Sequence, residues 1–181
     1  MTKLILPVKK NISGMTLVEV LVVVLLFSVL FGACFAVILS GSESWQTNSA
    51  YIQLTQELRK GMEWMKEDLI ETGTSVITDV PVDGNWYNTI TFRRINSVTG
   101  GNIVWATDTS KFLLGGTNGR QLISRQGVST DKIIAQDIKT LQIRRPVGSS
   151  DIVEVSMTAE RTTPRGRVLS AALNFQVRVR N

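Results

Sequence analysis

The hydrophobic and polar residues of the chain follow three patterns in succession, and the first is apolar. An almost unbroken apolar stretch runs from Met15 to Leu39, with Glu19 as its only charged side chain. As a helix at about 1.5 Å per residue it would be roughly 37 Å long, enough to cross a bilayer core of ~30 Å. The stretch exceeds the ~7–15 apolar residues of a signal peptide, and no small-residue cleavage site follows it. We therefore expect a retained membrane helix.

The second pattern places apolar side chains at helical spacing on an otherwise charged segment. No proline occurs between Met15 and Val80, and Thr72-Gly73 supplies a helix stop. The pattern predicts one helix from Met15 to about Glu71, with its second half docked on a sheet; two helices hinged near Gly41 are the alternative. The side chains expected on roughly one face are Trp45, Ile52, Leu58, Met62, Met65 and Leu69.

The third pattern is an alternation of apolar and polar residues, which is typical of half-buried strands. Ile133–Ile138 fits either a short strand or a helical turn. Glycine-marked turns at short spacing favour antiparallel meanders, so the predicted fold class is α+β: a long N-terminal helix with antiparallel sheet packed on its outer half. The predicted strands are Ser75–Val80, Trp86–Ile95, Ile103–Thr107, Lys111–Leu114, Gln121–Arg125, Leu141–Arg145, Asp151–Ala159 and Val168–Arg180.

Two of these strands have one clean apolar face each, which predicts that both line the core. In the first, the apolar side chains are Val153, Val155, Met157 and Ala159. In the second they are Leu169, Ala171, Leu173, Phe175, Val177 and Val179, opposite Asn174, Gln176, Arg178 and Arg180. We expect the strand aromatics Trp86, Tyr87 and Trp105 to lie in the core rather than on a recognition surface.

Taken together, the patterns divide the chain into four predicted parts. These are a leader (1–14), a transmembrane and assembly helix (15–39), an amphipathic continuation of the helix (40–73) and an antiparallel β-rich globular domain (74–181). Lysines occur before the apolar stretch and no comparable basic cluster follows it at once. The positive-inside rule therefore predicts a single-pass protein with a cytoplasmic N-terminus and an extracytoplasmic domain.

The net charge and the numbers of histidine and cysteine residues limit which binding and catalytic functions the chain can have. The net charge is +5, from 20 Lys+Arg against 15 Asp+Glu. Without residues 1–14, and with them Lys3, Lys9 and Lys10, the count is 20 − 3 = 17 against 15, so basicity is a weak argument for nucleic acid. The chain has no histidine, and its single Cys34 lies in the apolar stretch, which excludes His-based triads, His-ligated metal sites and an intramolecular disulfide.

Glu19 requires a partner, because a carboxylate in a spanning helix costs about 2.5–3.5 kcal/mol at the centre and less near an end. If a protease cuts after Gly14, Met15 acquires a free α-amine, and a carboxylate at i+4 can pair with an amine in its own chain or in a neighbour. The helix macrodipole also favours negative charge at this end. The alternative is an ordinary signal anchor with a polar residue near the interface.

The stretch from Ser13 to Leu39 resembles the class III signal of type IV pilins and type II secretion pseudopilins. A basic leader ends in Gly14, MTLVEV follows, and the apolar run continues; Met15 stands where the family usually has phenylalanine. The resemblance implies that prepilin peptidase cuts the Gly14–Met15 bond and methylates the Met15 amine. It also implies that Glu19 neutralises the N-terminus of an adjacent subunit during filament assembly.

The remainder resembles the J-type minor pseudopilin of type II secretion and related minor pilins, through the order of ITFRR, LISRQG, IIAQDIKTLQIRR and the final VRVRN. The chain has neither the dense Asp/Asn run of a calcium-binding loop nor the spine proline and C-terminal disulfide loop of major pilins. The resemblance implies a minor subunit at the tip of a short periplasmic filament on the inner (cytoplasmic) membrane. Its partners would be I- and K-type minor subunits and the major subunit, with no cofactor.

Two other functions are alternatives on the sequence. A minor pilin of a type IV or DNA-uptake (competence) pilus would use arginines to contact phosphates: Arg93, Arg94, Arg144, Arg145, Arg165, Arg167, Arg178 and Arg180. A membrane-anchored enzyme would use carboxylates such as Asp79, Asp83, Asp108, Asp131 and Asp137, but none has a base or metal partner at a recognisable spacing. We therefore expect no catalytic activity.

Overall fold

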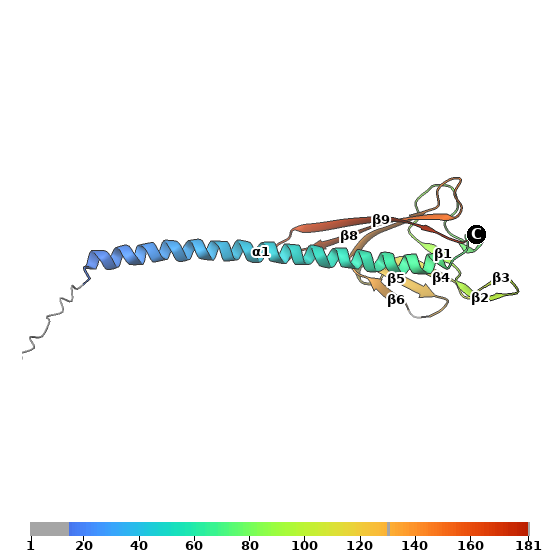
Figure 1. The fold of residues 1–181 in the computed structure, drawn as a ribbon, viewed down its shortest axis with the longest axis horizontal. Helices are drawn as coiled ribbons and strands as arrows, with labels where there is room; N and C mark the ends of the chain where they lie inside the picture. Colours follow the sequence, from blue (N-terminus) through green and yellow to red (C-terminus); the bar gives the residue numbers. More distant parts are fainter. Residues whose placement is uncertain (1–14, 130, 181) are drawn as a thin grey trace, which may run out of the picture. The chain divides into compact units, whose positions relative to one another are not determined.

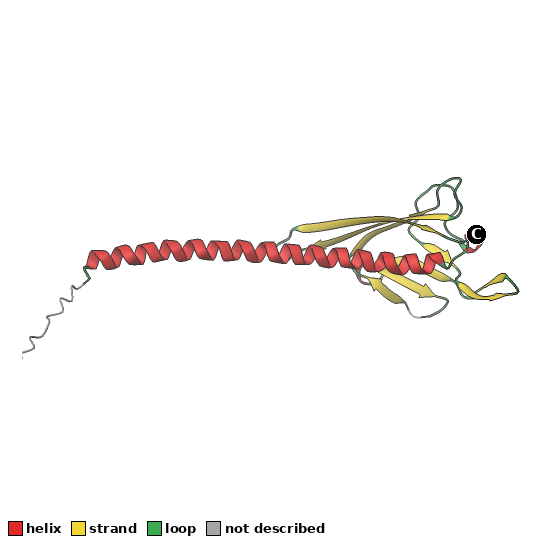
Figure 2. Cartoon of the chain, viewed as in Figure 1, coloured by secondary structure: helices red, strands yellow, loops and turns green. Residues whose placement is uncertain are grey.

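The computed structural model describes residues 15–129 and 131–180, so the predicted leader and Gly14 lie outside the described residues. The chain divides into two compact units, Met1–Trp45 and Gln46–Asn181, which are taken separately below. Helix α1 (Leu17–Ile70) belongs to both units, and its helical structure passes Gly41 without interruption (Figures 1 and 2). The predicted helix is confirmed to within about two residues at either end.

In the first unit, α1 is apolar enough and long enough to cross a membrane. Every described side chain from Met15 to Leu39 is exposed. A soluble helix with this composition would be covered by other parts of its own domain, because apolar surface in water is costly. The first half of α1 therefore has the length and surface of a membrane span.

In the second unit, α1 buries one face against the β-strands. Leu58, Met65 and Leu69 are fully buried as predicted, and Met62 is partly buried. The expectation for Trp45 and Ile52 was wrong, because both side chains are exposed. Leu54 takes the buried place one turn before Leu58. Ile52 precedes Leu54 by two positions, which places it roughly 160° around the helix and so on the exposed side.

The strands form three antiparallel sheets, which confirms the α+β class. One sheet has the order β1-β4-β5-β6, a second is the hairpin β2-β3, and the third has the order β7-β8-β9 (Figure 1). The bounds are β1 Ile90–Phe92, β2 Ile95–Thr99, β3 Asn102–Trp105, β4 Ser110–Gly115, β5 Gln121–Gln126, β6 Lys132–Ala135, β7 Ile138–Arg144, β8 Ile152–Thr162 and β9 Val168–Arg178.

Two predicted strands were wrong. Ser75–Val80 contains no strand: the short 3-10 helix η1 (Thr74–Val76) begins it, and the Arg145 guanidinium donates to the carbonyl oxygens of Thr74 and Val80. Side-chain groups, together with a backbone hydrogen bond from the Thr78 N–H to the Thr91 oxygen of β1, therefore hold that segment in place of a strand ladder. Trp86–Ile95 is split into β1 and β2 around Arg94, whose side chain turns toward α1.

The undecided segment Ile133–Ile138 also divides. Its first part belongs to β6, and β7 begins at Ile138. Asp137 between them has a φ of 59°, in the left-handed region that ends a strand. The segment is therefore two strands joined by a sharp turn.

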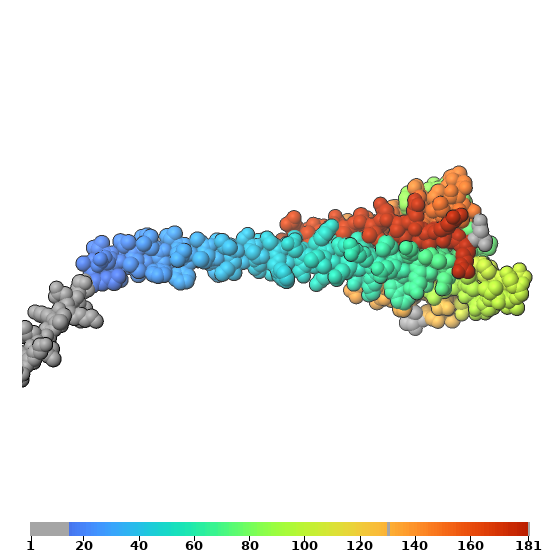
Figure 3. All heavy atoms as spheres, in the orientation of Figure 1, coloured from blue at the N-terminus to red at the C-terminus, as the bar shows by residue number. Residues whose placement is uncertain are grey.

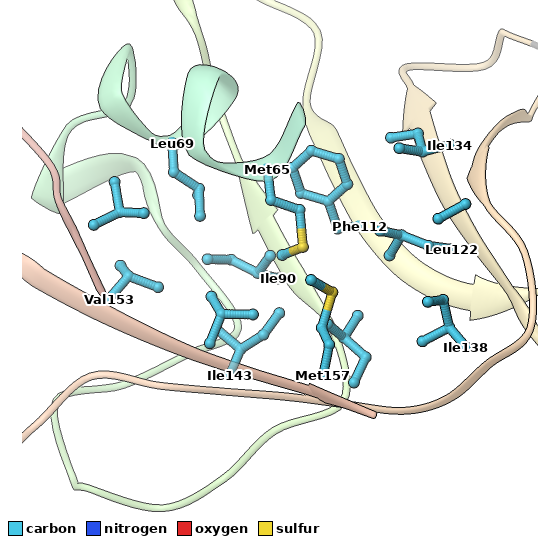
Figure 4. Packing of buried hydrophobic residues seen from close by; sticks show 14 of the residues in the cluster. Met65, Leu69, Ile90, Phe112, Leu122, Ile134, Ile138, Ile143, Val153 and Met157 are labelled. Atoms are coloured by element: carbon cyan, nitrogen blue, oxygen red, sulfur yellow. The ribbon is translucent and has the colours of Figure 1, made fainter. Parts of the chain in front are cut away.

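The core lies between the second half of α1 and the two larger sheets. Figure 4 shows Met65 and Leu69 of α1 facing Ile90, Ile143 and Met157 from the strands. The predicted face of β8 is confirmed, since its four apolar side chains are all buried.

The apolar face of β9 is buried or half-buried along its length, while its polar positions are exposed. The expectation that the strand aromatics lie in the core is wrong for Trp86, which is 42% exposed. Its ring packs outside the core against the Arg144 guanidinium, whose carbon lies 4.4 Å from the ring centroid. Tyr87 and Trp105 are half-buried.

Candidate assembly site at the start of the apolar helix

Thr16 and Glu19 cap the first turn of α1. The Thr16 backbone N–H donates to Glu19 Oε2 at 2.9 Å, and the Thr16 hydroxyl donates to the same oxygen at 3.1 Å. In return, the Glu19 backbone N–H donates to Thr16 Oγ1 at 3.3 Å. This reciprocal arrangement is a capping box, in which Ser or Thr at the N-cap and Glu three residues later satisfy each other's backbone donors.

The cap changes the account of Glu19 as an unpartnered charge. The structure gives the carboxylate a partner in its own chain, the backbone N–H and hydroxyl of Thr16. In the uncleaved chain the Met15 nitrogen is a peptide amide, so the pairing of Glu19 with an α-amine stays a prediction. The helix N-terminus adds a favourable field for a negative group. Sequence reasoning missed Thr16, although the spacing T-x-x-E before an apolar run was a signal for it.

Within the part of the chain that the structure describes, one oxygen of the carboxylate has no hydrogen-bond partner. Among the hydrogen bonds of the described chain, all of those to Glu19 use Oε2, and Oε1 accepts none. The side chains of Met15 and Leu17 on either side of the cap are exposed. A cationic group from outside the chain can therefore approach Oε1 without first displacing Thr16.

The surface around and beyond the cap is uniformly apolar. Phe27 and Phe31 stack on one side of the helix with ring centroids 6.2 Å apart, and the Ser28 hydroxyl is satisfied by the Leu25 carbonyl at 2.8 Å. Cys34 is a free, exposed thiol on the same segment. This surface can bind lipid or the apolar helices of other subunits, because it offers packing and almost no polar contacts.

Four of the eight arginines considered for phosphate binding have partners for their side chains within the domain. Arg94 is paired with Asp68, and Arg144 with Glu154 at 2.6 Å. Arg178 is paired with Asp151 at 2.7 Å. The fold therefore uses much of this charge to join its own elements.

Arg145 is engaged in a different way, because it is 6% exposed and bonded to backbone carbonyls. Its Nη2 donates to the Ser150 oxygen at 2.6 Å, and further bonds reach Thr74 and Val80. Burial lowers the pKa of Arg145 from its usual value. The side chain joins the segment from Thr74 to Val80 to the loop between β7 and β8, and it is not available to a nucleic acid.

Most of the carboxylates considered for catalysis have structural partners. Asp79 accepts from the backbone N–H and hydroxyl of Thr91, and Asp137 is paired with Arg161. Hydrogen bonding from the Tyr87 hydroxyl and from the Asn85 backbone N–H holds the pKa of Asp83 below its usual range.

The Arg125 guanidinium likewise lowers the pKa of Asp131. Lowered values suit ionised structural groups better than general acids. No group of three His, Cys, Asp or Glu placed to hold a metal occurs among residues 15–129 and 131–180.

Comparison with known families gives one match. Residues 9–35 match the family described as the prokaryotic N-terminal methylation motif. That match supports a type IV pilin-like protein that prepilin peptidase processes and that assembles with other pilins. With the apolar helix, it indicates a membrane-anchored, single-pass protein. Comparison with curated proteins and with solved structures gave no match.

Proposed function

We propose that the chain is a minor pseudopilin of a type II secretion system. It is processed by prepilin peptidase, inserted in the inner membrane with its domain outside the cytoplasm, and assembled at the tip of the pseudopilus. The observation that carries the proposal is the first unit of the chain, where a capped carboxylate with one available oxygen precedes an entirely exposed apolar helix.

The chemistry of assembly follows from this geometry. Cleavage of the Gly14–Met15 bond releases an α-amine, and methylation leaves it cationic. The N-terminus of one subunit would then approach Glu19 Oε1 of a neighbour as the apolar helices pack together. Because the two charges meet where water is scarce, their pairing is favourable only when the geometry brings them into contact. Pairing therefore favours the correct axial register between subunits.

The assignment to a minor subunit rests on the second unit and on the sequence. The only cysteine of the sequence, Cys34, lies on the apolar helix, so the domain has no cysteine for a disulfide loop, and α1 contains no proline. The order of motifs from ITFRR to VRVRN supports the J-type assignment. Neither observation concerns catalysis, and we propose a structural role without enzymatic activity.

A minor pilin of a type IV or competence pilus is the alternative function. It shares the processing and the helix packing, but it would need a DNA-binding surface if it serves uptake. The internal pairing of Arg94, Arg144 and Arg178 weighs against that surface. Salt-dependent DNA binding by the purified protein would favour this alternative, because phosphate contacts weaken steeply with salt.

The first experiment is intact and N-terminal peptide mass spectrometry of the membrane-extracted protein, with and without prepilin peptidase. We expect a chain that begins at Met15 with one added methyl group only when the peptidase is present. A chain that still begins at Met1 in the presence of the peptidase would overturn the proposal. Deleting the major pseudopilin, but not the major pilin, should then remove the protein from filaments; the reverse result would identify a pilus subunit.

A further inference from the structure

Strand β9 is a long edge strand with a partner on one side only. It pairs with β8 along its whole length, from Val168 opposite Thr162 to Arg178 opposite Ile152. The sheet order β7-β8-β9 leaves its other side at the edge. Figure 3 shows β9, in red, at the surface of the second unit. An edge of this length is a template for pairing with another chain unless something blocks it.

The hydrogen bonds at the two ends of β9 show which backbone groups point outward. Val179 N donates to the Asp151 oxygen, and Thr163 N donates to the Arg167 oxygen, both at 2.8 Å. Odd-numbered residues therefore direct N–H and C=O toward β8, since the direction alternates along an antiparallel strand. The outward set is Val168, Ser170, Ala172, Asn174, Gln176 and Arg178.

The next even-numbered residue shows that this outward edge can accept a strand. Arg180 N donates to the Thr72 oxygen, and Thr74 N donates to the Arg180 oxygen, both at 2.9 Å. Residues 72–74 thus already extend the sheet by one bridge, in which Gly73 lies opposite Arg180. Among the backbone hydrogen bonds outside strand ladders in the described chain, none involves the six outward residues.

The outward edge lacks the features that usually prevent strand addition. Its central side chains are Ser170, Ala172, Asn174 and Gln176, all exposed and all uncharged. The strand contains no proline, its pairing with β8 has no bulge, and its only charged residue, Arg178 at the end, is already paired with Asp151. Edge strands that stay unpaired usually carry charges, prolines or bulges.

The core-facing side of β9 shows which residues the added strand would contain. Val177 and Leu169 are buried, whereas Ala171, Leu173 and Phe175 between them are only partly buried against the core. A strand placed beside β9 would project alternate side chains onto this same face. Apolar residues at those positions would cover Leu173 and Phe175, and polar residues would occupy the outer face.

We propose that the outward edge of β9 binds an extended strand of a neighbouring, different pilin-like subunit, which becomes the fourth strand of the β7-β8-β9 sheet. Backbone groups in a row are satisfied by another backbone, and the uncharged edge offers nothing to phosphates or lipid headgroups. The partner strand alternates apolar and polar residues. The identity of the partner class rests on the proposed function, whereas the edge itself does not.

The test is site-specific photo-crosslinking of the full-length protein in its native host, on a Cys34→Ala background. A benzophenone is attached to Asn174→Cys at the edge or to Gln142→Cys as the matched control. Gln142, Ser156 and Asn174 form one row across the sheet, so both probes lie on the same face. Gln142 is on β7 at the opposite edge of the sheet, where Ile143 is already bridged to Tyr87. We expect a crosslink from position 174, and not from 142, to a strand peptide of a protein that carries the N-terminal methylation motif.

A pair of variants tests the backbone contact. Ala172→Pro removes an outward N–H and leaves the β8–β9 hydrogen bonds in place, whereas Ala172→Val keeps the N–H. We expect the proline variant to reduce the crosslink about tenfold or more, because it leaves a buried acceptor on the partner unpaired. The valine variant should crosslink normally. A thermal melt checks that the proline variant folds; if it does not, Ala172→Lys replaces it as the variant that blocks the edge with a charge.

Several outcomes would overturn the inference. These are equal crosslinking from positions 174 and 142, a crosslink to a second copy of this chain or to a protein without the motif, and a normal crosslink from a folded edge-blocking variant. Intact mass measured in the same extract separates this inference from the proposed function. A processed chain beginning at Met15 without any crosslink overturns the edge alone, while a chain beginning at Met1 overturns the proposed function.

Discussion

Asp68 on α1 and Arg94 between β1 and β2 form an ion pair where the helix meets the sheets. Arg94 Nη2 lies 2.5 Å from Asp68 Oδ2, and Asp68 is only 6% exposed. Burial raises the pKa of Asp68 despite the attraction of Arg94, so desolvation opposes the ionised carboxylate. Arg94 Nε is buried without a hydrogen-bond partner in the described part of the chain. The pair therefore aligns two elements at a cost in desolvation.

Removal of one partner should be more harmful than the pair's net contribution suggests. We expect Asp68→Ala to lower the free energy of unfolding by about 1–3 kcal/mol, because it leaves the Arg94 guanidinium partly buried and uncompensated. Urea unfolding measures the change. The matched control is Glu67→Ala, an exposed neighbour on the same helix, for which the change should stay within about 0.5 kcal/mol. Equal effects of the two substitutions would contradict the role given to Asp68.

Gly73 is required by the close approach of Trp105. A Cβ atom at Gly73 would lie 2.5 Å from Trp105 Cη2 and Cζ2, although the φ of −100° suits any residue. Gly73→Ala should therefore destabilise the domain by about 1–3 kcal/mol through overpacking. The added cost should shrink in a Trp105→Leu background, as measured by urea unfolding in a double-mutant cycle. An unchanged cost in that background would show that the clash is not with Trp105.

Two substitutions of Glu19 separate its role as a cap from its role in assembly. Glu19→Gln keeps a side chain that the capping box accepts, whereas Glu19→Ala removes the cap and the charge. We expect both variants to be cleaved and methylated by prepilin peptidase, and both to be depleted from filaments, because neither can pair with a cationic N-terminus. Filament fractionation with mass spectrometry measures this. Normal incorporation of Glu19→Gln would show that the cap, and not the charge, is what assembly needs.

Glu160 should make part of the stability dependent on pH. A hydrogen bond from Lys139 and the nearby charges of Lys139 and Arg120 lower the pKa of Glu160. The folded state therefore binds the proton less strongly than the unfolded chain. The stabilisation is present above the unfolded value of about 4.3 and is lost as the pH falls through the folded pKa. Glu160→Gln should melt at a temperature that falls less on acidification; identical pH profiles would refute this. The pKa of Asp68 is raised rather than lowered, so its contribution to stability changes with pH in the opposite direction. Only the difference in melting temperature between the variant and the parent is therefore informative.

The second unit should fold without the membrane helix. We expect a fragment from about Ser44 to Asn181 to be soluble and to unfold cooperatively, because its core is made by strands and by the buried face of α1 after residue 46. Circular dichroism during heating tests this. An insoluble fragment, or a gradual melt, would mean that the boundary is misplaced.

The elements with strong apolar periodicity were predicted correctly from the sequence. The prediction was wrong where hydrogen bonds and ion pairs of side chains override the local periodicity. α1, β8 and β9 were found because apolar residues recur regularly over many positions. Ser75–Val80 was misread because its alternation is real but its backbone groups are held by Arg145 and by β1 rather than by a strand ladder. The break at Arg94 depends on a buried partner 26 residues earlier, which no local pattern reveals.

At the candidate site, the carboxylate was identified by its cost in an apolar helix and by the motif around it. Its intrachain partner Thr16 was not predicted, because the cost of the charge and the cleavage motif both point to the amine at Met15 rather than to a nearby hydroxyl. The outward edge of β9 was also invisible in the sequence, since alternation gives the faces of a strand but not which of its edges is open.

The division of β9 into odd and even residues gives the strand two independent sets of substitutions. Odd positions hold the strand to β8 and supply the core, so changes there put folding at risk. The even positions up to Asn174 carry neither task, so proline, charge or bulk can be exchanged there at little cost to the domain, whereas Gln176 and Arg178 bond to Glu154 and Asp151. Point mutations at these even positions can therefore change which partner binds this edge during evolution. Selection for a stable fold acts separately, on the odd positions.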